Sequence, residues 1–183
     1  MMRKSEFFEK MVLRNTDSIS AVPPKLFHQE RDWTCSIACI RTLLSAIEET
    51  VPAEDEFVEK YGLVPGPHYS RDIKKLNLLE GYDVIYGCDD RDDNFDDILD
   101  MMKQGYYIML ESMVNYSHWL VLLGYFANAD TNDIEKTKLL FFDPYYNELK
   151  LMNTEEFIGM WIDGNYAVSK VKHDYIAIKK QEK

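Results

Sequence analysis

The stretch HQERDWTCSIACIRTLL, residues 28–44, decides the fold, because it opens an apolar helix with a cysteine. From Cys35 onward, apolar side chains recur every three or four residues, at Ile37, Ile40, Leu43, Leu44 and Ile47. Small residues between them allow close packing against a neighbour. This spacing predicts a central helix over residues 35–47 with one buried face.

Helices are predicted mainly on the N-terminal side of the chain and strands on the C-terminal side. Apolar spacing and turn residues predict helices over residues 4–14, 53–61, 70–79 and about three turns from 95 to a stop at Gly105. Apolar, β-prone runs predict strands over residues 82–86, 106–110, 118–126, 138–142, 147–152 and 173–178, with a capped helix at 154–161. We therefore expect an α+β fold with an antiparallel sheet.

The length of 183 residues suits one domain. Residues 1–24 are expected to form an N-terminal helix and loop extension, and residues 25–183 the domain itself. The polar insert at 127–137 is interpreted as a surface loop, and no internal repeat is found.

Composition narrows the classes of function. A net charge of -11 and a pI near 4.8 disfavour binding to nucleic acid or anionic lipid, because like charges repel. No apolar run reaches the roughly 20 residues needed to cross a bilayer, and the N-terminus lacks a signal-peptide core. A soluble, cytoplasmic protein without membrane insertion is expected, and no cofactor or metal is predicted.

The three cysteines, Cys35, Cys39 and Cys88, show neither zinc-ligand spacing nor a disulfide framework. Cys35 begins the predicted helix, where backbone N–H groups stabilise a thiolate. Gln29 lies six residues upstream. Its amide could join the Cys35 backbone N–H in an oxyanion hole. Cys39 lies mid-face, as structural cysteines usually do.

His118 opens the apolar strand HWLVLLGYF, where its ring can face a site while the strand stays in the core. A satisfied or solvent-facing imidazole is the alternative. Among the other histidines, His28 could approach the site, whereas His68 and His173 have no obvious partner in the sequence.

Asp143 ends the strand LLFFD and precedes Pro144. A carboxylate there can orient the His118 ring and stabilise its imidazolium, which completes a nucleophile, base and orienter. A turn-capping Asp in an Asp-Pro corner is the alternative.

This order of Gln29, Cys35, His118 and Asp143-Pro144 resembles the double-glycine leader peptidases of bacteriocin export and their stand-alone relatives, a branch of the papain-like cysteine peptidases. DILDMMKQGYYIML and TEEFIGMW also look like that family's helix-glycine-strand and late helix. The WTCSIACIRTLL segment is similar to a family labelled guanylyl cyclase domain-containing, although nothing here resembles a paired-metal nucleotide site. The resemblance covers about residues 26–178.

The resemblance implies a thiol protease with a Cys-His-Asp catalytic triad, most simply a peptidase. Acyl transfer or deamidation on the same site, and a non-catalytic peptide-binding or regulatory module, remain alternatives. The chain departs from the family at Thr34, usually Asp, and Ser36, usually Gly. A peptide or protein substrate is expected; leader removal would also need a partner exporter, of which the sequence shows no sign.

Two further groups of residues could have a functional role. Trp33, Ser36, Trp119 and Tyr145, with Tyr146, are candidates to contact substrate, with ordinary packing as the alternative. The acidic residues Asp89, Asp90, Asp92, Asp93, Asp96, Asp97 and Asp100 lack the glycine turn and terminal Glu of an EF-hand. A solvated loop and helix start is favoured for them.

Overall fold

A seven-stranded antiparallel sheet forms the centre of the protein. A computed structural model describes residues 18–87, 94–112, 117–126, 137–161 and 171–181. The strand order is β2-β7-β3-β4-β5-β6, and β1 pairs with β4. The strands are β1 (Ile19–Ser20), β2 (Asp83–Tyr86), β3 (Tyr107–Ser112), β4 (His118–Phe126), β5 (Lys138–Asp143), β6 (Glu148–Asn153) and β7 (Tyr175–Lys179).

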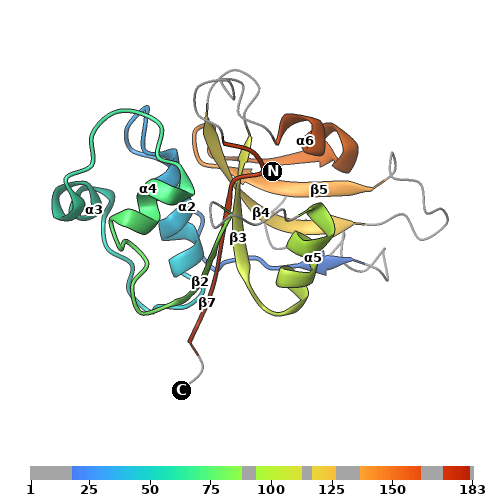
Figure 1. Ribbon diagram of the computed structural model, residues 1–183, viewed down its shortest axis with the longest axis horizontal. Coiled ribbons are helices and arrows are strands. Elements are labelled where there is room, and N and C mark those ends of the chain that lie inside the picture. Colours follow the sequence, from blue (N-terminus) through green and yellow to red (C-terminus); the bar gives the residue numbers. More distant parts are fainter. Residues whose placement is uncertain (1–17, 88–93, 113–116, 127–136, 162–170, 182–183) are drawn as a thin grey trace.

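Helices lie on both sides of this sheet (Figure 1). Helices combined with an antiparallel sheet make the fold α+β. They are α2 (Cys35–Leu44), α3 (Glu54–Tyr61), α4 (Ser70–Lys75), α5 (Phe95–Lys103) and α6 (Thr154–Met160). Figure 1 shows α2, α3 and α4 on one side and α5 and α6 on the other. None of the helices in the described ranges is long and apolar enough to cross a membrane.

The predicted elements that lie in the described ranges are present, with shorter helices and with strand ends that differ by at most two residues. The helix predicted over 70–79 stops at Lys75, because Asn77 adopts a left-handed φ of 51°. The loop predicted over residues 15–24 is interrupted by β1, in which Ile19 and Ser20 pair with Tyr125 and Gly124. The helix predicted over 4–14 lies outside the described residues.

Both faces of the sheet are buried, which explains the unbroken apolar run of β4. Trp119, Val121 and Leu123 belong to the core beneath α2, whereas Leu120 and Leu122 belong to the core beneath α5 and α6. Successive side chains of a strand point to opposite faces, so a strand covered on both sides needs apolar residues throughout.

The pairing of β4 with β5 brings two distant residues to the same end of the sheet. The strands are antiparallel with Val121 opposite Phe142, so the start of β4 lies beside the end of β5. His118 is the first residue of β4 and Asp143 the last of β5. The α2 helix packs on β4 at the same place, where the Cys39 thiol donates to the Trp119 carbonyl oxygen at 3.4 Å.

Candidate active site

Cys35 is the first residue of α2 and is partly exposed. Thr34 precedes it as the N-cap residue, and the Thr34 carbonyl oxygen accepts from the Ala38 N–H at 3.0 Å. The N–H groups of a helix's first turn have no partner inside the helix, so they can donate to negative charge beside the Cys35 sulfur. The helix therefore begins where the sequence predicted the nucleophile.

The His118 ring pairs with Asp143 and lies near Cys35. Its Nε2 lies 2.9 Å from Oδ1 of Asp143, which leaves Nδ1 for the Cys35 side chain. Burial alone would lower the pKa of His118, but the hydrogen bond with Asp143, the Cys35 side chain and the charges of both raise it to about 9. The ring is thus an imidazolium at neutral pH, suited to pairing with a thiolate.

Asp143 is almost completely buried at the end of β5, with its side chain 1% exposed. Oδ1 accepts from His118 and from the Tyr145 backbone N–H at 2.9 Å, and Oδ2 accepts from Lys150 Nζ at 2.5 Å. Burial favours the uncharged acid, but the hydrogen bonds from His118 and Lys150 hold the pKa of Asp143 well below its usual range. The Asp143 side chain both caps the Asp-Pro turn and contacts His118. The turn-capping role and the orienting role considered from the sequence are therefore compatible.

Gln29 lies beside the turn formed by Asp143 and Pro144. Its backbone N–H donates to the Pro144 carbonyl oxygen at 3.1 Å, and its side chain is buried. Nε2 donates to the Arg31 carbonyl oxygen at 2.7 Å. Because an amide nitrogen carries two hydrogens, one N–H remains for another acceptor. His28, beside it, contacts the Tyr145 carbonyl oxygen through Nε2 at 3.2 Å.

A scan against protein-family models gave no match, and neither did a search of curated proteins. The interpretation of this site therefore depends on its own residues and their contacts.

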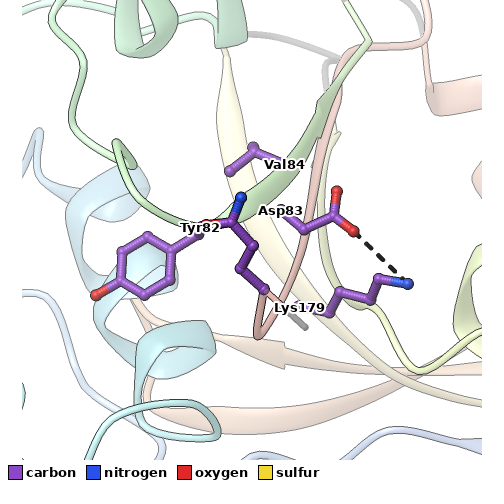
Figure 2. A pocket seen from close by; sticks show the side chains of 5 residues that line it. Tyr82, Asp83, Val84 and Lys179 are labelled. Atoms are coloured by element: carbon purple, nitrogen blue, oxygen red, sulfur yellow. Dashed lines mark ion pairs between the residues drawn. The ribbon is translucent and has the colours of Figure 1, made fainter. Parts of the chain in front are cut away.

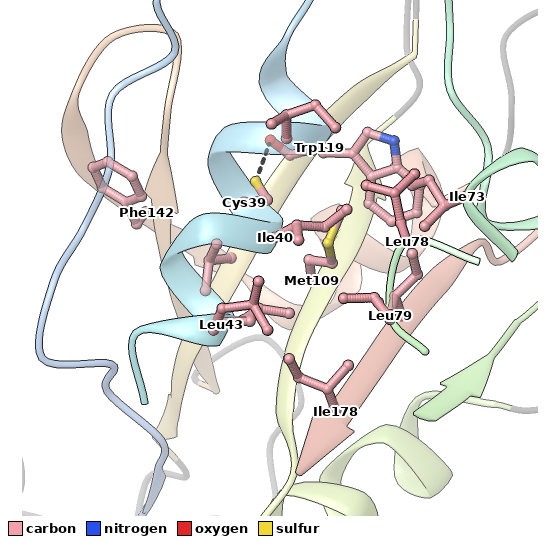
Figure 3. Packing of buried hydrophobic residues seen from close by; sticks show 14 of the residues in the cluster. Cys39, Ile40, Leu43, Ile73, Leu78, Leu79, Met109, Trp119, Phe142 and Ile178 are labelled. Atoms are coloured by element: carbon pink, nitrogen blue, oxygen red, sulfur yellow. Dashed lines mark hydrogen bonds between the residues drawn. The ribbon is translucent and has the colours of Figure 1, made fainter. Parts of the chain in front are cut away.

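Cys39 has the same side chain as Cys35 but a different environment. It is fully buried one helical turn further on, among apolar side chains (Figure 3). Burial, reinforced by the charges of Cys35 and Asp143, raises its pKa well above the ordinary value, so it remains a thiol. Of the two cysteines in the described ranges, Cys35 is the one placed to react. Cys88 lies outside those ranges.

Glu54 is a functional candidate that the sequence did not indicate. It is fully buried at the start of α3 and accepts from the Thr34 hydroxyl at 2.6 Å and from the Glu30 backbone N–H at 3.0 Å. These contacts tie α3 to the segment that links Gln29 to Cys35. A carboxylate therefore does lie beneath the helix start, although Thr34 replaces the Asp of the resembled family. Nothing local in EDEFVEKY separates this Glu from its exposed neighbours.

His68 has partners that the sequence did not predict. Its Nδ1 lies 3.5 Å from the Ser36 hydroxyl, its ring centroid is 5.7 Å from that of Trp33, and its carbonyl oxygen accepts from Trp119 Nε1 at 2.8 Å. The Ser36 and Trp119 side chains are buried in these contacts. Trp119 is therefore a packing residue and not an exposed substrate contact. His173 also has a ring partner, since it stacks on Trp161 with centroids 4.7 Å apart.

Aromatic side chains remain exposed on the other side of His118. Tyr145 is 47% and Tyr146 61% exposed, and the Tyr145 ring lies edge-on to His118 with centroids 6.4 Å apart. Trp33 is partly buried. Of the predicted contact residues, Trp33, Tyr145 and Tyr146 are thus the ones with rings open to a substrate.

Two other features lie away from these residues. A hollow of about 440 Å³ lies at the β2–β7 edge, lined by Tyr82, Asp83, Val84, Lys179 and Gln181, none of which belongs to the site (Figure 2). In the acidic segment, Asp96 and Asp97 lie in the first turn of α5, while positions 89–93 are outside the described ranges. Within those ranges, no three His, Cys, Asp or Glu side chains gather as a metal site.

Proposed function

We propose that this protein is a cysteine hydrolase of papain-like arrangement, most simply a peptidase. The observation that carries the proposal is that one ring, His118, is held by the buried Asp143 at 2.9 Å and lies close enough to Cys35 for that side chain to raise its pKa. Nucleophilic catalysis by a thiol needs these three roles within hydrogen-bonding reach. A histidine that only completed the hydrogen bonding of the core would not need a partly exposed thiol at the start of a helix as its second partner.

In the first stage, the Cys35 thiolate attacks the carbonyl carbon of the substrate. The Cys35 backbone N–H and the remaining amide N–H of Gln29 donate to the oxyanion. The tetrahedral intermediate collapses as the His118 imidazolium gives its proton to the leaving amine. The products of this stage are the free amine, a thioester on Cys35 and a neutral His118.

In the second stage, neutral His118 takes a proton from water, which attacks the thioester and releases the acid. An amine that replaces this water turns the same site to acyl transfer, and a side-chain amide as substrate turns it to deamidation. The exposed Tyr145 ring beside His118 suits a peptide or acyl chain better than a strongly charged substrate.

The proposal is tested with a cysteine-directed acyl probe, with the labelled residue identified by mass spectrometry. We expect one equivalent of label on Cys35, none in Cys35→Ala, and slower labelling in His118→Ala. Cys39→Ala provides a matched control on the same helix. Equal labelling of Cys35 and Cys88 would contradict the proposal.

The reaction type is then read from the products of a diverse peptide mixture. Cleaved peptides indicate hydrolysis, products joined to an added amine indicate acyl transfer, and Gln-to-Glu conversion indicates deamidation. Peptides retained on the protein without any product would favour a binding module, in contradiction of the proposed hydrolase.

A further inference from the structure

Lys150 makes a contact that the Cys-His-Asp arrangement does not require. It lies on β6, and its Nζ is 2.5 Å from Oδ2 of Asp143, on the opposite oxygen from His118. The Asp143 side chain is 1% exposed and that of Lys150 29%. One buried carboxylate therefore holds two cations, one on each oxygen.

The other groups around this carboxylate come from three elements. Glu148, on β6, lies 3.9 Å from Lys150 Nζ, and the Tyr146 ring lies 4.4 Å from it. Cys35, at the start of α2, acts on the pKa of His118, the charge of Asp143 acts on that of the buried Cys39, and Tyr145 contacts the His118 ring. Lys150 is the permanent cation of this group, because the charge of His118 changes during the proposed reaction.

We propose that Lys150 is a positioning residue that competes with His118 for Asp143 and so weakens the hold of that carboxylate on the His118 proton. The inference rests on the proposed function, since it concerns the same thiolate and imidazolium. It adds a residue that touches neither substrate nor sulfur.

The reason for such a residue lies in the two stages of the reaction. In the first stage His118 gives up a proton, and in the second it must be neutral to accept one from water. A buried carboxylate with no other cation would hold the imidazolium more firmly and slow both steps. The positive charge of Lys150 offsets part of the negative charge of Asp143, so the pKa of His118 stays closer to the working pH.

The test is the titration of the His118 ring, followed by NMR in the full chain and assigned with His118→Gln. In Lys150→Met, we expect the midpoint to rise by about one pH unit, because a like charge has been removed from a partly buried site. Lys150→Arg should keep the native midpoint. Lys179→Met is the matched control, since Lys179 also lies on a strand and pairs with an Asp, at 3.6 Å from Asp83, away from the site.

Activity gives a second measurement. Removal of the Lys150 charge raises the pKa of His118 in the thioester intermediate too and leaves less neutral His118 at pH 7, so kcat limited by thioester hydrolysis should fall by up to about tenfold in Lys150→Met and be restored in Lys150→Arg. Circular dichroism and Tm of each variant show whether it is folded.

The outcomes separate this inference from the proposed function. A native His118 midpoint near that of an ordinary histidine would contradict the thiolate–imidazolium pair, and the role of Lys150 with it. A high native midpoint that is unchanged in Lys150→Met, in a folded protein, would overturn the role of Lys150 alone. An equal shift in Lys179→Met would also overturn it, since the effect would then be one of overall charge.

Discussion

The two faces of the sheet use the same strands for different purposes. On β5, Phe141 packs against an aromatic cluster formed with Phe95, Phe157 and Trp161 on the α5–α6 face. The next residue, Phe142, packs beneath α2, and the residue after it is Asp143. The α5–α6 face is filled by rings in contact, whereas the start of β4 and the end of β5 carry the polar residues His118 and Asp143 near the start of α2. The rings thus stabilise the sheet, and the candidate chemistry lies at its end.

The largest expected effect lies at the start of α2. Cys35→Ala should reduce turnover by about 10⁴-fold or more, because no other described thiol faces His118. Cys39→Ala should keep most of the activity and lower the free energy of unfolding by about 1 kcal/mol, as for a lost buried methyl group. Steady-state kinetics with urea unfolding tests both, and similar activity in the two variants would contradict the assignment.

A matched pair of phenylalanines tests whether the faces are separate. Phe157→Ala and Phe142→Ala should each lower the free energy of unfolding by about 3–5 kcal/mol, since both side chains are fully buried. At a temperature where both variants are folded, we expect kcat to fall in Phe142→Ala, which disturbs Asp143, and to stay near native in Phe157→Ala. Equal losses of kcat would mean that the faces are coupled.

The charge of His118 should make the stability of the protein depend on pH. Its folded pKa of about 9 lies above the ordinary value of 6.5, so its stabilisation is complete below pH 6.5 and is lost as pH rises through 9. The difference in unfolding free energy between the native protein and His118→Gln should shrink by about 3 kcal/mol over that interval. Urea unfolding at pH 6 and pH 9.5 measures it, and a constant difference would contradict the ion pair.

The smallest effect is expected at Glu54. Glu54→Gln replaces one acceptor oxygen of the group that holds the Glu30 N–H and the Thr34 hydroxyl, so the segment between Gln29 and Cys35 should loosen. We expect kcat to fall about tenfold, or about 1.4 kcal/mol, with little change in KM. Glu56→Gln, an exposed cap on the same helix, is the control, and equal kinetics in the two variants would refute a role for Glu54.

Sequence alone predicted most of the candidate site, because its residues lie at element boundaries. Cys35 begins a helix, His118 begins a strand and Asp143 ends one, and each boundary was visible from apolar spacing and Pro144. The proximity of His118 and Asp143 then follows from antiparallel pairing of neighbouring strands. The α+β class was predicted for the same reason.

The missed residues share a different property. Glu54, His68 and Lys150 reach the site from segments whose local pattern is that of an ordinary surface helix, turn or strand. Their contacts depend on how α3, α4 and β6 are placed in space, and periodicity carries no information on that placement. The β1 pairing was missed because two residues are too few for an alternating pattern.

The position of β7 has a consequence for synthesis of the chain. β7 lies between β2 and β3, pairing Ile178 with Val84 on one side and with Tyr107 on the other. While the protein is being translated, the sheet therefore stays open at this point until residues 175–179 have left the ribosome. Closing it requires contacts between residues about 70 and 95 positions apart, which is slow compared with local folding. Until then β2 and β3 each present an unpaired edge, so a nascent chain stalled before Tyr175 is a candidate for chaperone binding.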